Sequence, residues 1–260
     1  MSALAASNLT VKRGGREILK LLNVAFRSGQ VTAVLGPNGA GKSTLLAGLA
    51  GLLRARHGAV TLDQKDLSTL KPQARSRRIG FLPQNPEIAW PIDVQTLVAL
   101  GRIQHRQTSS SADNTRAVAE AMRITDTSQW ASRDVTTLSG GERARALLAR
   151  VLAGEPEWIL ADEPFAGLDP AHQFEACELF RALAASGRGV IVTLHDLTLA
   201  ARVADRVVVM VEGRIIADDV PREAMSRELL RNAYGIEAQW VHEDSQGSGS
   251  VIAILGRHRG

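Results

Sequence analysis

A glycine-rich stretch near the N-terminus carries the clearest chemical signal: Gly36-Pro37-Asn38-Gly39-Ala40-Gly41-Lys42-Ser43, followed by Thr44. Glycines let successive backbone N–H groups point into one concavity without Cβ clashes, and a helix that begins there adds its positive end. Lys42 would reach the β- and γ-phosphates of a nucleotide, and the hydroxyl of Ser43 would hold Mg²⁺. A merely structural glycine turn would not need this Lys-Ser pair, so the spacing predicts a phosphate site.

Two adjacent acids, Asp162 and Glu163, follow the apolar run from Trp158 to Ala161. In open α/β sheets, ligands bind at the carboxyl ends of the strands. Asp162 would face the Mg²⁺ through water, and Glu163 would polarise an attacking water. The alternative is that both acids only cap the turn that starts at Pro164. The phosphate loop upstream favours the catalytic interpretation.

Short apolar runs alternate with helical patterns along the chain. Predicted strands include Leu9 to Lys12, Val31 to Leu35, Val60 to Leu62, Ile79 to Leu82, Trp158 to Ala161, Val190 to Leu194, Val207 to Val211 and Val251 to Leu255; predicted helices include Lys42 to Leu53, Ala117 to Met122, Pro170 to Ala185 and Leu197 to Ala204. This alternation predicts an α/β fold with a largely parallel sheet. From about Trp90 to Ala153 the helical spacing indicates an inserted helical subdomain, and Asp244 to Ser250 is a predicted loop.

Composition excludes several classes of protein. The chain has 260 residues and a net charge of +4 that is not concentrated in one block, which disfavours nucleic-acid binding. The arginines at 75, 77 and 78 and the tail Arg257-His258-Arg259 predict solvated faces or, alternatively, contact with an anionic membrane surface. The single cysteine, Cys177, cannot form an intrachain disulfide and is expected to pack in a helix. No run approaches the roughly 20 apolar residues that cross a bilayer, so other chains would have to supply any membrane path.

Further motifs follow the phosphate loop in a fixed order. Leu138-Ser139-Gly140-Gly141-Glu142 opens the predicted helix Glu142 to Leu152, and a serine hydroxyl with glycine amides at a helix N-terminus makes a second anion site. Gln84 follows one predicted strand, and His195 follows another. Ala166-Gly167-Leu168-Asp169 comes shortly after the paired acids. A lone histidine at a strand end is usually structural, but here it belongs to a set.

Together these motifs resemble those of the ABC ATPase family over about residues 4 to 235. The resemblance implies a P-loop NTPase fold: a RecA-like core with an antiparallel β edge, formed by residues 1–89 and 158–235. It also implies a helical subdomain at 90–157 that carries the signature motif, and a C-terminal tail at 236–260. The implied activity is ATP hydrolysis with Mg²⁺.

The resemblance also assigns roles to single residues. Gln84 would sense Mg²⁺ and the γ-phosphate, His195 would contact the γ-phosphate, and Asp169 would cross a dimer interface. The implied assembly is a head-to-tail homodimer with two ATP molecules between the subunits. In it the signature of one subunit, Ser139 to Glu142, grips the γ-phosphate held by the other.

The implied setting is the cytoplasmic face of the inner membrane, where the protein is peripheral. Its partners would be transmembrane permease subunits and, indirectly, a solute-binding protein, with no nucleic acid. Leu82-Pro83-Gln84, Val98-Ala99-Leu100-Gly101-Arg102 and Tyr234-Gly235-Ile236 resemble importer ATPases for iron-siderophore, heme and vitamin B12. Zinc, manganese and molybdate stay open as solutes, and the direction of transport is also open.

Two other functions compete with this interpretation. A soluble ABC ATPase of DNA repair or translation would carry long coiled-coil inserts or tandem ATPase domains, whereas each motif occurs once here. A regulatory domain that only binds nucleotide would not need Glu163 and His195.

Two departures from the family pattern affect the base site and the signature. The family usually stacks an aromatic residue on adenine, and the matching position here is Arg13, whose planar guanidinium can also stack on a base. Ala144 stands where a glutamine is common after the signature. The segment from Asn85 to Pro91 offers Ile88 and Trp90 as apolar anchors, which predicts docking of the membrane partner; the alternative is that Trp90 packs in the subdomain's own core.

Overall fold

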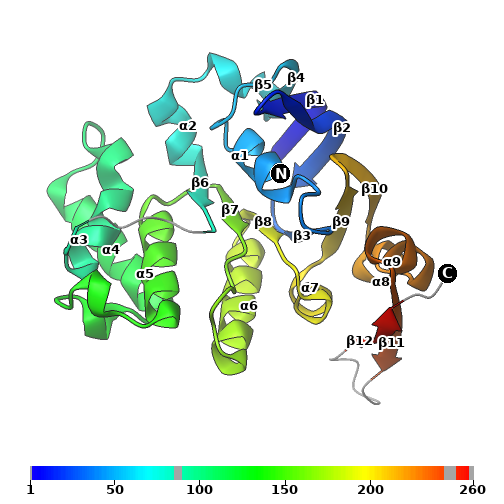
Figure 1. Cartoon of the computed structure of the whole chain (residues 1–260). Coiled ribbons are helices and arrows are strands. Elements are labelled where there is room, and N and C mark those ends of the chain that lie inside the picture. The colour runs from blue at the N-terminus through cyan, green and yellow to red at the C-terminus, as the bar shows by residue number, and fades with distance from the viewer. Residues whose placement is uncertain (1, 85–89, 243–249, 258–260) are drawn as a thin grey trace.

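The computed structural model describes residues 2–84, 90–242 and 250–257, and a six-stranded sheet crosses its centre (Figure 1). The order is β10-β9-β3-β8-β7-β6, with β3 (Val31–Leu35), β6 (Ile79–Leu82), β7 (Trp158–Asp162), β8 (Gly189–Thr193), β9 (Arg206–Val211) and β10 (Arg214–Asp219). All neighbours are parallel except β10, which pairs antiparallel with β9. Every residue of β3, β7 and β8 is buried, as expected of central parallel strands covered on both faces.

A second sheet of four antiparallel strands forms the edge that the resemblance implied. Its order is β2-β1-β4-β5, with β1 (Ala3–Arg13), β2 (Arg16–Arg27), β4 (His57–Leu62) and β5 (Lys65–Asp66). The helix α1 (Lys42–Leu49) lies between the two sheets, because its buried leucines share one core with Leu4 and Phe26 of the antiparallel sheet and Leu160 of the parallel one. The expected α/β fold is therefore confirmed.

Helix α1 is shorter than the sequence pattern predicted. It ends at Leu49 instead of Leu53 because Gly51 adopts a left-handed φ of 68°. The amide of Gly51 then donates to Gly48 O and that of Leu52 to Ala47 O, both at 2.9 Å. These two bonds satisfy the last carbonyls of the helix and close it.

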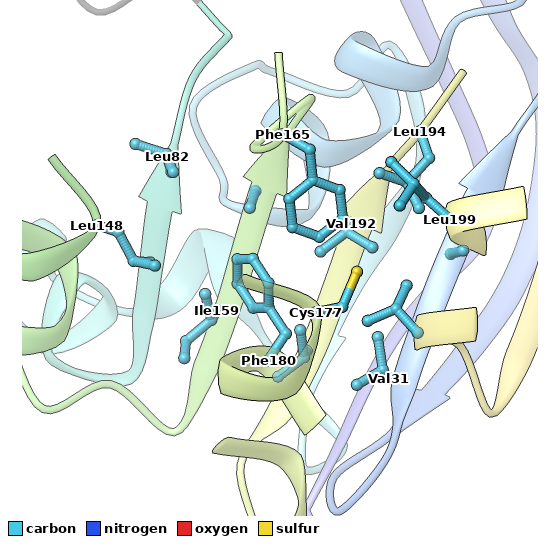
Figure 2. Close-up of a cluster of buried hydrophobic side chains, with 14 of the residues drawn as sticks. Val31, Leu82, Leu148, Ile159, Phe165, Cys177, Phe180, Val192, Leu194 and Leu199 are labelled. Carbon is cyan, nitrogen blue, oxygen red and sulfur yellow. The ribbon is translucent and has the colours of Figure 1, made fainter. Parts of the chain in front are cut away.

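The other face of the parallel sheet is covered by α6 (Pro170–Ala185) and α7 (Leu197–Val203) (Figure 2). Phe165 and Phe180 meet edge to face with ring centroids 5.7 Å apart. Cys177 packs beside them in α6, as predicted, and burial raises the pKa of its thiol to about 11. This thiol therefore stays protonated and acts as a core side chain.

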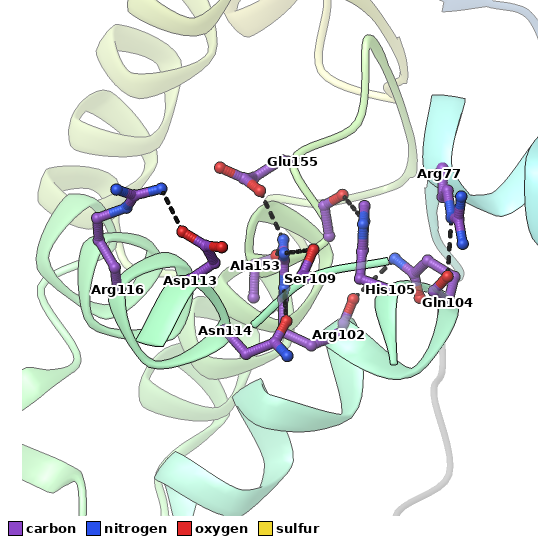
Figure 3. A network of polar contacts seen from close by, with 12 residues as sticks. Arg77, Arg102, Gln104, His105, Ser109, Asp113, Asn114, Arg116, Ala153 and Glu155 are labelled. Carbon is purple, nitrogen blue, oxygen red and sulfur yellow. Dashed lines mark hydrogen bonds and ion pairs between the residues drawn. The ribbon is translucent and has the colours of Figure 1, made fainter. Parts of the chain in front are cut away.

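Three helices lie together at one end of the sheet, at the left of Figure 1: α3 (Val94–Ala99), α4 (Ser111–Ile124) and α5 (Gly140–Ala153). One buried arginine, in the 3-10 turn Leu100–His105 that follows α3, connects this turn to the other two helices (Figure 3). The guanidinium of Arg102 donates to Ala153 O at 2.8 Å, to Glu155 at 2.6 Å and to Asn114 at 2.9 Å. Because removing one partner leaves a buried charge uncompensated, this network fixes the turn after α3, Leu100–His105, relative to α4 and the end of α5.

The arginine cluster at 75–78 lies on α2 (Pro72–Arg78), a helix the pattern did not predict. Arg77 donates to Gln104 O at 2.8 Å, and Arg78 pairs with Glu157 and Asp63. Both side chains are half-buried, and they join segments far apart in the sequence, which the prediction of a solvated face did not include.

The described residues of the C-terminal segment, 221–242 and 250–257, form helices and strands. The segment contains α8 (Pro221–Ala224), α9 (Arg227–Tyr234) and a hairpin of β11 (Ile236–His242) and β12 (Ser250–Arg257). Only a strand within β12 was predicted. The hairpin packs on α7, where Thr198 donates to Ile252 O at 3.2 Å. The predicted loop from Asp244 lies outside the described residues until Ser250.

Candidate functional site

The phosphate loop joins β3 to α1 in a conformation that glycine makes possible. Gly36 has φ 146°, and a Cβ there would come within 2.1 Å of Met210 O on β9. Gly41, with φ 100°, is the N-cap residue of α1 and offers no side-chain cap. The first N–H groups of α1 are therefore left for an external anion.

Lys42 is folded back onto this loop. It is 6% exposed, and its ammonium donates to Gly36 O at 2.7 Å and to Pro37 O at 3.2 Å. Burial lowers the pKa of Lys42, while the carboxylates of Glu163 and Asp162 oppose that shift. The loop thus holds a poorly solvated cation next to open backbone donors, and this arrangement suits an oligophosphate.

A pocket of about 660 Å³ opens at the loop. Most of the predicted site residues line it, together with Ile18 of β2, which the sequence did not single out: Arg13, Ile18, Asn38, Gly39, Ala40, Gly41, Lys42, Ser43, Thr44, Gln84, Glu163 and His195. Arg13 and Ile18 come from the antiparallel sheet, so that sheet supplies one wall of the pocket. An apolar side chain beside a guanidinium offers a surface for a flat base.

Glu163 is held between two polar side chains on the opposite wall. Its Oε2 accepts from the Gln84 amide at 2.6 Å, and its Oε1 lies 2.5 Å from His195 Nε2. The three residues follow β6, β7 and β8, which are neighbours in the sheet. The parallel register therefore brings together side chains that are 79 and 32 positions apart.

Asp162 lies below this wall and is 5% exposed. Its Oδ1 accepts from the hydroxyl of Thr193 at 2.6 Å, and that hydroxyl accepts from the amide of Glu163 at 2.8 Å. Both acids use their carboxylates for these contacts rather than for the turn at Pro164. Thr193 was missed, although a polar residue at the end of an apolar strand was the available signal.

The signature motif lies elsewhere. Ser139 is the N-cap of α5: its hydroxyl accepts from Glu142 N at 3.3 Å, and its amide donates to the Glu142 carboxylate at 2.8 Å. This capping box lowers the pKa of Glu142, chiefly through the backbone bond from Ser139. A Cβ on Gly141 would lie 3.2 Å from Leu168, so the signature packs beside the segment that ends at Asp169.

Asp169 caps α6 and accepts from the amide of His172 at 3.0 Å and from its ring at 2.8 Å. Neither Asp169 nor the signature residues line the pocket at the phosphate loop. Within one chain, the structure thus gathers the loop with Gln84, Glu163 and His195, and keeps the second predicted anion site apart.

The predicted docking segment is described only at its end. Residues 85–89, including Ile88, lie outside the described residues, whereas Trp90 is 75% exposed. The alternative that Trp90 packs in the core of the helical region is therefore wrong.

The ABC transporter family matches residues 19–166. The hemin import ATP-binding protein of Rhodococcus jostii is 43% identical over 249 residues, spanning 96% of this chain and 85% of its own. The cobalamin import ATP-binding protein of Halobacterium salinarum is 40% identical over 255 residues, spanning 98% of this chain and 64% of its own.

Solved structures show the same likeness. A metal-chelate type ABC transporter in an inward-facing conformation has a TM-score of 0.84 and 27% identity, covering 98% of both chains. A dimeric bacterial ABC transporter cassette has a TM-score of 0.76 and 26% identity, covering 84% of this chain and 99% of that one. No helix in the described part of the chain is long and apolar enough to cross a membrane. By its motifs, its fold and these relatives, the chain belongs to the ABC transporter family, as one of the ATP-hydrolysing subunits that drive transport.

Proposed function

We propose that the pocket at the phosphate loop binds MgATP and that Glu163 activates the water that attacks the γ-phosphate. The observation that carries this proposal is the placement of the Glu163 carboxylate, fixed by Gln84 and His195 on the wall that shares one pocket with Lys42. A general base needs a fixed position within reach of the nucleophile, and two hydrogen bonds supply it.

The residues also suit a magnesium ion. Ser43 lines the pocket with a hydroxyl, and Gln84 offers an amide oxygen. Asp162 adds a buried carboxylate, which accepts a hydrogen bond from Thr193. Oxygen ligands of this kind are those Mg²⁺ prefers, and the bound ion would neutralise charge on the β- and γ-phosphates. Lys42 would leave its two loop carbonyls to meet the same oxygens.

The second half of each site would come from a second copy of the chain. Ser139 to Glu142 open a helix N-terminus that is exposed or half-buried and does not reach the pocket of its own chain. A head-to-tail homodimer would bring it to the partner's γ-phosphate, with Asp169 near the interface. The dimeric relative supports this arrangement.

We further infer that the assembly imports a heme-like or corrinoid metal chelate through permease subunits, at the cytoplasmic face of the inner membrane. The names of the two import relatives and of the metal-chelate transporter support this class of solute. Residues 1–89 and 158–235 would form the ATP-binding core, 90–157 the moving helical subdomain and 236–260 a C-terminal unit. Trp90, exposed where the first two parts meet, would contact the permease.

Mixing two inactive chains tests the shared site. Lys42→Ala disables the loop and Ser139→Arg blocks the signature, so a mixed dimer has one site with neither defect. We expect each variant alone to be inactive and the mixture to recover part of the ATPase rate. A mixture as inactive as its components would overturn the shared site. Uptake of hemin, cobalamin and a ferric siderophore into proteoliposomes that contain the permease then identifies the solute.

A further inference from the structure

One side chain of the C-terminal segment reaches the phosphate loop. Tyr234 is the last residue of α9, and its hydroxyl accepts a hydrogen bond from the amide of Gly36 at 2.6 Å, across 198 positions of sequence. Burial raises the pKa of Tyr234 to about 12, so the phenol stays neutral over the physiological range. None of the roles assigned to the ATP site so far uses this contact.

Gly36 is held from both ends of its backbone. Its amide donates to Tyr234, and its carbonyl accepts from Lys42 at 2.7 Å. A phosphate draws the Lys42 ammonium away from that carbonyl, because one cation cannot serve both groups fully. The bond to Tyr234 does not compete with phosphate, so it holds the base of the loop while Lys42 changes partners.

The end of α9, which carries Tyr234, is held in place by contacts with β11. Arg231, one turn earlier in α9, makes two bonds to the Glu237 carboxylate at 2.6 and 2.9 Å. Gly235 ends the helix with a left-handed φ of 64° and turns the chain into β11. A hydroxyl carried on such a support can preset the position of the amide it contacts.

We propose that Tyr234 is a positioning residue for nucleotide binding, whose hydroxyl fixes the Gly36 peptide so that the phosphate loop is preformed before ATP arrives. This inference rests on the proposed function, in which that loop binds ATP. It gives the C-terminal segment a direct effect on the site, although the segment follows all the nucleotide-binding motifs in the sequence.

Tyr234→Phe removes the hydroxyl and keeps the ring. A net hydrogen bond corresponds to a roughly three- to tenfold effect, so we expect the Kd for MgATP to rise by that factor. The KM should rise equally while kcat stays within about twofold, because a preformed loop favours bound substrate and transition state alike. A fluorescent ATP analogue and steady-state ATPase rates measure these quantities.

Trp240→Phe is the matched control. It removes a hydrogen bond of the same segment, from the indole to Met225 O at 3.2 Å, without touching the phosphate loop. This variant should lower the melting temperature but keep the wild-type Kd. Equal weakening of ATP binding in both variants would show that only the general stability of the segment matters and would overturn the inference.

Two further results decide the remaining cases. A Kd within about twofold of wild type for a folded Tyr234→Phe chain overturns the positioning role. Lys42→Ala, measured in parallel, tests the ATP site itself: if it still binds, the proposed function fails, and if it does not, an unaffected Tyr234→Phe refutes only this inference. Should Tyr234→Phe not fold, amide exchange in the wild-type protein decides, because the Gly36 amide must exchange more slowly than the exposed Gly39 amide.

Discussion

The phosphate loop and the signature turn are both helix N-termini made of glycine and serine, but they differ in how their donors are used. At α1 the N-cap is Gly41, which provides no side-chain acceptor, so the first amides stay open. At α5 the N-cap is Ser139, which forms a complete capping box with Glu142. The N-terminus of α1 therefore keeps its backbone N–H groups free for a ligand, whereas the N-terminus of α5 satisfies part of its backbone donors with its own side chains.

This difference indicates a division of labour. The loop holds the buried Lys42, which lies close enough to Glu163 to feel its charge, so the loop offers an anion site within one chain. The signature has a negative carboxylate, Glu142, in its first turn, and none of its residues lines the pocket of its own chain. In the proposed dimer it would therefore act on a nucleotide bound to the other chain. Five variants test this contrast.

The largest effect is expected for Glu163→Gln. The change keeps the shape of the side chain but removes the charge that polarises water, so turnover should fall by about 10²- to 10⁴-fold. Nucleotide binding by the loop should persist, and an ATP-bound dimer should accumulate on size-exclusion chromatography with MgATP. A wild-type rate of hydrolysis would exclude Glu163 as the base.

Lys42→Ala should remove most of the affinity of the monomer's phosphate loop for ATP. Losing a buried charge that faces phosphate costs about 2–5 kcal/mol, which is roughly a 30-fold to several-thousandfold loss of affinity. Titration with a fluorescent ATP analogue measures it. The corresponding change at the signature, Ser139→Ala, should leave the affinity of the monomer unaltered, and a loss there would end the contrast between the two helix ends.

The serines themselves should behave oppositely in thermal unfolding. Ser139→Ala removes the N-cap of α5 at about 1 kcal/mol, a fall in melting temperature of about 2–4 °C. Ser43→Ala removes no cap, so the melting temperature should stay constant while the Mg²⁺ dependence of ATP binding weakens. Calorimetry of both nucleotide-free variants, with wild type as the reference, decides this.

The smallest effect concerns pH. Because the folded pKa of Glu142 is lowered, its stabilising bond is present above the ordinary glutamate value and is lost as pH falls through the lowered value. Glu142→Gln should flatten the part of the stability curve that lies below the ordinary pKa of glutamate. The same variant should favour ATP-dependent dimerisation, since it removes a negative charge beside the partner's phosphates. An unchanged acid limb would show that the capping carboxylate does not contribute.

The local motifs were predictable because their chemistry depends on neighbours in sequence. The phosphate loop is a continuous stretch from Gly36 to Ser43, and the two acids, Asp162 and Glu163, follow one apolar strand. Contacts set by tertiary structure were not predictable: Ile18 in the pocket depends on how the two sheets pack, and Tyr234 on Gly36 depends on packing across 198 positions. The helix end at Gly51 was missed because apolar spacing continues past it, while backbone geometry decides where a helix stops.

Glu163 has one more property, its backbone φ of 50°, which lies in the left-handed region that bulky residues avoid. Such a conformation costs about 1–3 kcal/mol and persists only where the surroundings enforce it. Glycine or asparagine would relieve the strain at this position. Selection of variants of this chain for thermal stability alone would therefore replace Glu163 early. The most stable variants obtained in this way would not hydrolyse ATP.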